Sequence, residues 1–156
     1  GLLKQYLMEA IEKMEADHIR LRFFGDLTRL EPELQELAHK TDAISDTYDG
    51  FQANVCVNYG GRDEIVNAVK KLAASGADLT ALTEQELSDN LYTSGMPDPD
   101  LIIRPSGEYR LSNYLIWQSA YAEFVFMDVL WPDFGAKELD AALEQFAGRN
   151  RRFGGV

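Results

Sequence analysis

The stretch Phe51-Gln52-Ala53-Asn54-Val55-Cys56-Val57-Asn58 is apolar and partly β-branched, which predicts a buried β-strand. It ends at Tyr59-Gly60-Gly61, and the following segment, Arg62–Ser75, has the spacing of a helix. Its apolar residues recur at Ile65, Val66, Val69 and Leu72. Gly76 then supplies a C-cap. A buried strand followed at once by a helix is the repeating unit of a parallel α/β sheet.

The same alternation continues on both sides of this unit. Periodicity predicts further strands over residues 19–24, 101–103 and 124–130, and helices over residues 2–16, 27–43, 83–92 and 136–146. The helix over 83–92 begins with a capping box, Thr83-Glu84-Gln85-Glu86. The strands are too apolar to be half exposed, which indicates a sheet covered on both faces. We therefore predict a single α/β domain over residues 1–156, with a parallel β-sheet flanked by helices.

Composition and charge argue against several classes of protein, among them nucleic-acid-binding and membrane-spanning proteins. The 156 residues are enough for one domain with a core, and the net charge of −11 argues against non-specific binding to nucleic acid. No apolar run approaches the roughly 18 residues of a membrane-spanning helix, and the start lacks the pattern of a signal peptide. The single cysteine, Cys56, is interpreted as a small buried hydrophobic residue, so we expect a cytoplasmic protein.

Small residues and arginines follow the predicted strands. Ligands of parallel sheets bind beyond the carboxyl ends of the strands. Gly25-Asp26, Gly60-Gly61-Arg62 and Arg104-Pro105-Ser106-Gly107-Glu108 occupy these positions. In the last two, small residues let backbone N–H groups approach a ligand beside a guanidinium group, which is typical of a phosphate site.

Several motifs resemble those of one enzyme family. The stretch Asp100–Gln118, which contains Arg104-Pro105-Ser106-Gly107-Glu108-Tyr109-Arg110-Leu111-Ser112-Asn113, resembles a signature of the undecaprenyl diphosphate synthase family of cis-prenyltransferases. Other stretches match in family order: Arg20–Asp26, Asn58–Arg62, Ala120–Glu123, Asp128–Phe134 and the Arg-x-Gly-like tail Arg151–Gly155.

The resemblance implies a prenyltransferase that condenses isopentenyl diphosphate with farnesyl diphosphate in a magnesium-dependent reaction. The product would be undecaprenyl diphosphate, the lipid carrier of bacterial cell-wall and peptidoglycan synthesis, although the sequence leaves product length open. The resemblance also implies a homodimer, with peripheral membrane contact through the lipid product left open. The cysteine usage and the net charge already indicate a cytoplasmic protein that binds no nucleic acid.

The same resemblance assigns roles to individual residues. Arg104 and Arg110, with Leu111 and Ser112, would hold the diphosphate of isopentenyl diphosphate. A guanidinium group suits this role because it can donate two parallel hydrogen bonds to phosphate oxygens, and a serine hydroxyl adds a neutral donor. If the segment is extended, Arg110 and Ser112 face the same side.

Two further assignments concern the metal and the dimer. Glu123 would bind Mg²⁺, which takes hard oxygen ligands and keeps waters and phosphate oxygens, so that one or two carboxylates suffice. Gly154, in the tail Arg152-Phe153-Gly154, would complete the partner's site across the dimer.

The chain also departs from the family pattern. Tyr109 stands where many members have histidine, so we assign it no metal or acid–base role. The family's Asp-Gly-Asn-Gly-Arg-type loop, which carries the catalytic aspartate, is not found: Asp49-Gly50 is followed by Phe51-Gln52. We therefore expect the catalytic aspartate upstream of Gly1, no catalytic residue within residues 1–156, and no activity from this chain alone.

Plainer interpretations stay open beside these. Arg104 would otherwise pair with Glu108 or Asp100 at the strand end, and Glu123 precedes a strand, which favours the opposite edge of the sheet. Trp131 is interpreted as core or interface. For the whole chain, the alternatives are a noncatalytic accessory subunit or dimerisation module of a two-component cis-prenyltransferase, and an unrelated phosphate-binding α/β enzyme.

Overall fold

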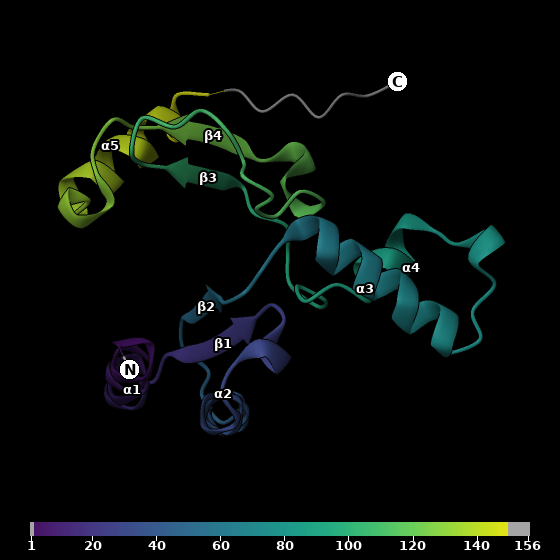
Figure 1. Cartoon of the computed structure of the whole chain (residues 1–156). Coiled ribbons are helices and arrows are strands. Elements are labelled where there is room, and N and C mark those ends of the chain that lie inside the picture. The colour runs from purple at the N-terminus through teal and green to yellow at the C-terminus, as the bar shows by residue number, and fades with distance from the viewer. Residues whose placement is uncertain (1, 150–156) are drawn as a thin grey trace. The chain divides into compact units, whose positions relative to one another are not determined.

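The computed structural model describes the backbone of residues 2–149, which forms two compact units (Figure 1). The amino-terminal unit runs to Thr93 and the carboxyl-terminal unit starts at Ser94. Each unit contains one pair of parallel strands together with helices. The α/β class with parallel strands is therefore confirmed, and the single domain over residues 1–156 stays a prediction.

In the amino-terminal unit, helices alternate with two strands. Strand β1 (Arg20–Phe24) pairs in parallel along its whole length with β2 (Gln52–Cys56). Helix α1 (Leu2–Asp17) precedes β1, α2 (Pro32–Ser45) connects β1 to β2, and α3 (Gly61–Ala74) follows β2. This order reproduces the predicted alternation, and α3 occupies the segment that the opening sequence stretch indicated.

The core of this unit lies between α1, α2 and β1, which pack together (Figure 1). Its buried residues are Met14, Leu21, Phe23, Leu34 and Ala38. Strand β2 is less covered, since Asn54 is exposed and Val55 is 37% exposed. The expectation of strands covered on both faces is wrong for β2, because α1 and α2 pack against β1.

Two predicted helices are shorter than expected. The helix over 27–43 is interrupted: a 3-10 turn, Leu27–Arg29, is followed by an extended Glu31 (φ −57°, ψ 143°), and α2 begins at Pro32. Proline lacks an N–H and forces an extended residue before it, so it fits only the first turn of a helix. Helix α4 (Glu84–Ser88) covers half of 83–92, but its capping box at Thr83 and Glu86 is confirmed.

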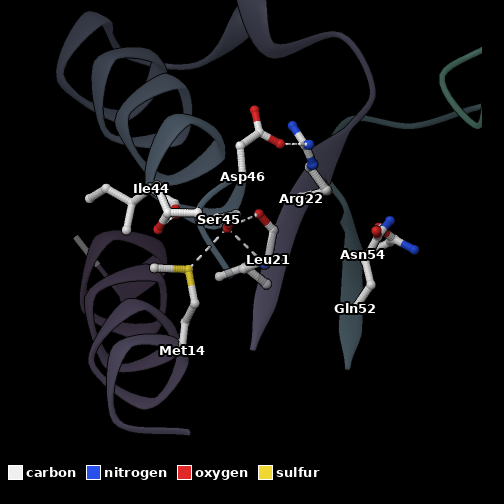
Figure 2. Close-up of polar contacts among 9 residues, drawn as sticks. Met14, Leu21, Arg22, Ile44, Ser45, Asp46, Gln52 and Asn54 are labelled. Carbon is white, nitrogen blue, oxygen red and sulfur yellow. Dashed lines mark hydrogen bonds and ion pairs between the residues drawn. The ribbon is translucent and has the colours of Figure 1, made fainter. Parts of the chain in front are cut away.

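Two side chains of α2 cap the free edge of β1. Arg20 and Phe24 bond to the chain of β2, so the backbone of Leu21 and Phe23 points the other way. The fully buried hydroxyl of Ser45 accepts a hydrogen bond from Leu21 N–H (2.8 Å) and lies 2.7 Å from Leu21 O (Figure 2). Asp42, one turn earlier, accepts a hydrogen bond from Phe23 N–H. Side chains of α2 thus supply hydrogen-bond partners that a neighbouring strand would otherwise supply to β1, at Leu21 and at Phe23.

In the carboxyl-terminal unit, β3 (Leu101–Arg104) pairs in parallel with β4 (Glu123–Phe126), and α5 (Ala136–Ala147) packs against β4. The predicted strand over 124–130 instead starts at Glu123 and ends at Phe126. Leu101 lies opposite Glu123, and Arg104 lies opposite Phe126. The crossover contains only a 3-10 turn, Gln118–Tyr121.

We predict that Ser45→Ala lowers the free energy of unfolding by about 1–3 kcal/mol, because it leaves the buried polar groups of Leu21 without their partner. Thr47→Ala is the matched control: its exposed hydroxyl donates to Ile44 O (2.7 Å), and its loss should change stability by about 0.5 kcal/mol or less. Urea unfolding followed by circular dichroism measures both. Equal effects of the two substitutions would contradict the edge-capping role.

A second prediction concerns pH. Burial raises the pKa of Asp42, against the opposing effects of Arg22 and of the Phe23 N–H. The folded state therefore holds the proton more tightly than the unfolded chain, so ionised Asp42 opposes folding at neutral pH, and this cost disappears as pH falls through the folded pKa. The stability of Asp42→Asn relative to the unsubstituted chain should be greatest near pH 7 and should decline toward pH 4. Thermal unfolding across this range tests it, with the exposed Asp49→Asn as control; a difference that grows on acidification would refute it.

Candidate functional site

A pocket of about 430 Å³ lies on one face of the β3–β4 pair in the carboxyl-terminal unit. Side chains alternate along a strand, so Arg104 shares its face with residues that form an apolar floor. The apolar lining is Ile102, Ile103, Pro105, Leu111, Tyr114, Phe124, Phe126 and Trp131, and the polar lining is Arg104, Ser106, Glu108 and Arg110. The pocket is therefore amphipathic: the end of β3 and the loop after it supply its charged groups, and the strands supply much of its floor.

Aromatic rings follow one another along this floor. The rings of Phe124 and Phe126 stack with centroids 6.0 Å apart, and Tyr109 packs on Phe126 at 5.2 Å. Trp131 is 68% exposed and stacks on Phe134 at 5.5 Å. The interpretation of Trp131 as a core residue is wrong, since its ring lines the pocket and remains accessible.

The two predicted diphosphate-binding arginines meet at one carboxylate. Arg104 Nη2 donates to Glu108 Oε2, and Arg110 Nη2 lies 2.6 Å from Glu108 Oε1. The hydrogen bond from Arg104, aided by the charge of Arg110, holds the pKa of Glu108 below its usual range. The plainer interpretation, in which Arg104 pairs with Glu108, is confirmed, and the same contact brings Arg104 and Arg110 together.

The loop between these residues is fixed by its backbone. Ser106 N–H donates to Val129 O (2.7 Å), and Gly107 N–H donates to Met127 O (2.9 Å). These N–H groups are thus used by the chain itself, so the expectation that they approach a ligand is wrong for both residues. Gly107 has φ +64°, and a Cβ there would lie 3.2 Å from Asp128 Oδ1, which explains why glycine fits this turn.

The other predicted anion ligands lie in different settings. Leu111 is half-buried and lines the pocket. Ser112 is exposed, has a left-handed backbone (φ 51°) and is not part of the lining. The segment after Arg110 is therefore not extended, and the alternation that would place Arg110 and Ser112 on one side does not apply. Gly154 lies outside the described residues.

Glu123, the predicted magnesium ligand, belongs to the same carboxyl-terminal unit as the pocket but does not line it. It precedes Phe126, the neighbour of Arg104, by three strand positions (126 − 123 = 3), and alternation turns its side chain to the other face. Arg149 Nη1 donates to Glu123 Oε2 (2.9 Å) and to Phe124 O (2.8 Å). Among residues 2–149, no three carboxylate, histidine or cysteine side chains gather as they would around a metal.

The amino-terminal unit has its own pocket, of about 440 Å³, beyond the carboxyl ends of β1 and β2. Asp26 lines it and caps the turn that follows β1, by accepting from Thr28 N–H (3.2 Å). The pocket also contains Tyr59, whose hydroxyl donates to Glu64 Oε2 (2.5 Å).

Glu64 is a buried carboxyl group that the sequence analysis missed. It is 2% exposed, and it also accepts from Tyr92 N–H (2.8 Å), which fastens the segment after α4 to the start of α3. The available signal was its spacing from Gly61, Ala68 and Leu72, which places it on the buried face of the helix.

Comparison with known proteins agrees with the motifs in these two units. The family model of undecaprenyl diphosphate synthases matches residues 1–154. The chain belongs to this family. An isoprenyl transferase of Brucella suis is 42% identical over 160 residues, which cover 100% of this chain and 63% of the relative. An isoprenyl transferase of Clostridium tetani is 42% identical over 163 residues, with 99% and 62% covered.

Solved structures of the family share the fold. A crystal structure of a probable undecaprenyl diphosphate synthase from Campylobacter jejuni aligns with a TM-score of 0.86 at 36% identity, over 99% of this chain and 72% of that one. Lavandulyl diphosphate synthase from Lavandula x intermedia, in complex with dimethylallyl diphosphate, aligns with a TM-score of 0.90 at 34% identity, over 97% and 67%.

The match covers only part of the relatives' length, and the helices were also compared with what a membrane span requires. The chain spans about 63% of the length of the curated relatives it matches. Among the described helices, none combines the length and the apolar character that crossing a membrane requires.

Proposed function

We propose that the carboxyl-terminal unit binds isopentenyl diphosphate, as half of the active site of a cis-prenyltransferase that extends farnesyl diphosphate to undecaprenyl diphosphate. The observation that carries this proposal is the meeting of Arg104 and Arg110 beside a pocket with an aromatic floor. In bacteria the product would serve as the lipid carrier of cell-wall synthesis.

The chemistry of the pocket supports an amphipathic ligand with a phosphorylated head. Two guanidinium groups can contact several oxygens of a diphosphate through charge-assisted hydrogen bonds. Phe124 and Phe126 offer apolar ring surface that suits a short branched hydrocarbon. A volume of about 430 Å³ lies within the range of small-molecule sites, roughly 300–1,000 Å³.

The relatives support the same class of ligand. Proteins that resemble this chain over its whole length are named isoprenyl transferases, and one solved relative was crystallised with dimethylallyl diphosphate. We propose that Leu111 and Ser112 assist the two arginines when the ligand is bound, and that Gly154 acts across a homodimer.

We propose that the reaction uses Mg²⁺, and the position of Glu123 limits where this ion can bind. The Glu123 carboxylate is a suitable hard ligand, and Mg²⁺ bound there would complete its coordination with water and phosphate oxygens. Its three-position offset from Arg104, about 10 Å along a strand, and its opposite face do not suit a shared diphosphate within one copy. We therefore propose that Glu123, released from Arg149, would serve a diphosphate bound by the second copy of a dimer.

The binding proposal has a direct test. We predict that Arg104→Ala weakens binding of isopentenyl diphosphate about 10–100-fold, because it removes a charge-assisted contact worth about 1.5–3 kcal/mol. Isothermal titration calorimetry with the 156-residue chain measures this. Lys137→Ala removes the same charge from an exposed position on α5 and should bind like the unsubstituted chain. If the chain bound no isopentenyl diphosphate, the accessory-subunit alternative would be favoured; if Arg104→Ala and Lys137→Ala were alike, the site would be misassigned.

The last prediction here concerns assembly and turnover by the chain alone. Exposed apolar residues in the carboxyl-terminal unit, among them Leu130, Leu139 and Leu143, favour a symmetric dimer. The purified chain should therefore sediment as a dimer at micromolar concentration.

No Asp-Gly-Asn-Gly-Arg-type loop is present to supply hydrogen-bond donors for the departing diphosphate. The purified chain should therefore form no butanol-extractable product from labelled isopentenyl diphosphate, farnesyl diphosphate and Mg²⁺. A monomer would refute the dimer, and label above a heat-killed control would refute the inactivity.

A further inference from the structure

Glu108 joins the two arginines in a way that leaves them able to bind a ligand. Each oxygen of its carboxylate contacts one guanidinium group, through Nη2 of Arg104 and Nη2 of Arg110. An arginine has five N–H donors spread over three nitrogens. The Nη1 and Nε groups of both side chains take no part in these contacts with Glu108 and can donate to an anion, while the carboxylate fixes the distance between the two guanidinium groups.

The three side chains differ in how firmly the fold holds them. Arg104 is the last residue of β3 and its side chain is 27% exposed, whereas that of Arg110 is 63% exposed. The long arginine side chain has much rotational freedom when it is exposed. Glu108 follows the turn at Ser106 and Gly107, whose backbone is bonded to the segment after β4. Glu108 is therefore placed to restrain Arg110, the less buried of the two cations.

We propose that Glu108 is a positioning residue that sets the spacing of Arg104 and Arg110, and thereby makes the site selective for two linked phosphoryl groups over a single one. This inference rests on the proposed function, in which these arginines hold a diphosphate. One phosphoryl group can be satisfied by either guanidinium alone. A diphosphate gains from contacting both at once, and that gain depends on their being held at a matching distance.

The charge of Glu108 acts in the opposite direction. A carboxylate beside the site repels every anion, and it repels pyrophosphate, the more highly charged of the two probes, more than orthophosphate. Removal of the charge alone would therefore strengthen the binding of both anions and would raise the pyrophosphate-to-orthophosphate affinity ratio. Loss of the fixed spacing weakens pyrophosphate specifically. A lowered ratio of the two affinities therefore reports the positioning role, because the loss of charge shifts this ratio in the opposite direction.

The experiment uses the full 156-residue chain and two probes, inorganic pyrophosphate and orthophosphate, by calorimetry at constant ionic strength. Glu108→Gln removes the charge at nearly constant size, and Glu108→Asp keeps the charge but shortens the reach by one methylene. Both should lower the pyrophosphate-to-orthophosphate affinity ratio about three- to ten-fold, the effect expected when one long side chain is no longer restrained. Asp140→Asn, an exposed carboxylate on α5, is the matched control and should leave the ratio unchanged.

A double-substitution cycle separates positioning from a general loss of structure. Arg110→Ala alone should lower the ratio, and in that background Glu108→Gln should not lower it further, because no second guanidinium remains to be positioned. If Glu108→Gln and Glu108→Asp do not fold, the Arg110→Ala arm still decides, since an unchanged ratio there overturns the two-cation selectivity. An unchanged or raised ratio in folded Glu108→Asp, which keeps the charge, overturns the positioning role alone. Failure of the unsubstituted chain to bind pyrophosphate overturns this inference and the proposed function together.

Discussion

Hydrogen bonding between parallel strands is the constraint on which both units depend. Parallel neighbours need a crossover connection, and their carboxyl ends meet at one edge. In the carboxyl-terminal unit this bonding continues past the strands: Met127 N–H donates to Arg104 O (3.0 Å), and the turn at Ser106 and Gly107 bonds back to the segment after β4. Those bonds fix the direction in which the chain leaves Arg104, and so they place Glu108.

The same constraint leaves backbone groups of β1 in the amino-terminal unit that need hydrogen-bond partners. A strand with one neighbour has unpaired N–H and C=O groups along its other edge. Ser45 of α2 meets both the N–H and the C=O of Leu21, and Asp42 of the same helix accepts from the N–H of Phe23. The edge is closed by side chains that are short and polar, and one of them carries a charge whose burial raises its pKa.

Strand alternation separates two chemistries in the carboxyl-terminal unit. Arg104, Phe124 and Phe126 share one face and form an amphipathic pocket, whereas Glu123 is turned to the other and is paired with Arg149. The residues proposed to bind the anion and the carboxylate proposed to bind the metal are close together in the motif but therefore lie on opposite faces of the strand pair within one copy of the chain. This separation is the reason for the proposal that Glu123 serves a diphosphate bound by a second copy.

The order of strands and helices followed from the sequence, because burial of a strand or a helix imposes a local periodicity. Element ends followed less well. The break before Pro32 was readable from proline's missing N–H, but the end of β4 at Phe126 was not, because the apolar residues beyond it differ from strand residues only in their partners. Likewise, the left-handed backbone of Ser112 belongs to a tight turn, and the spacing of apolar residues does not predict such a turn.

The sequence by itself determined the parallel α/β class, the family, and the arginines that make an anion site plausible, since these depend on local pattern and on residue type. Tertiary structure alone decided which carboxylate meets those arginines, that Trp131 lines the pocket and is not part of a core, and that Glu64 is buried. Contacts of this kind join residues through turns and strand registers, and the geometry of a turn is set by hydrogen bonds to distant segments.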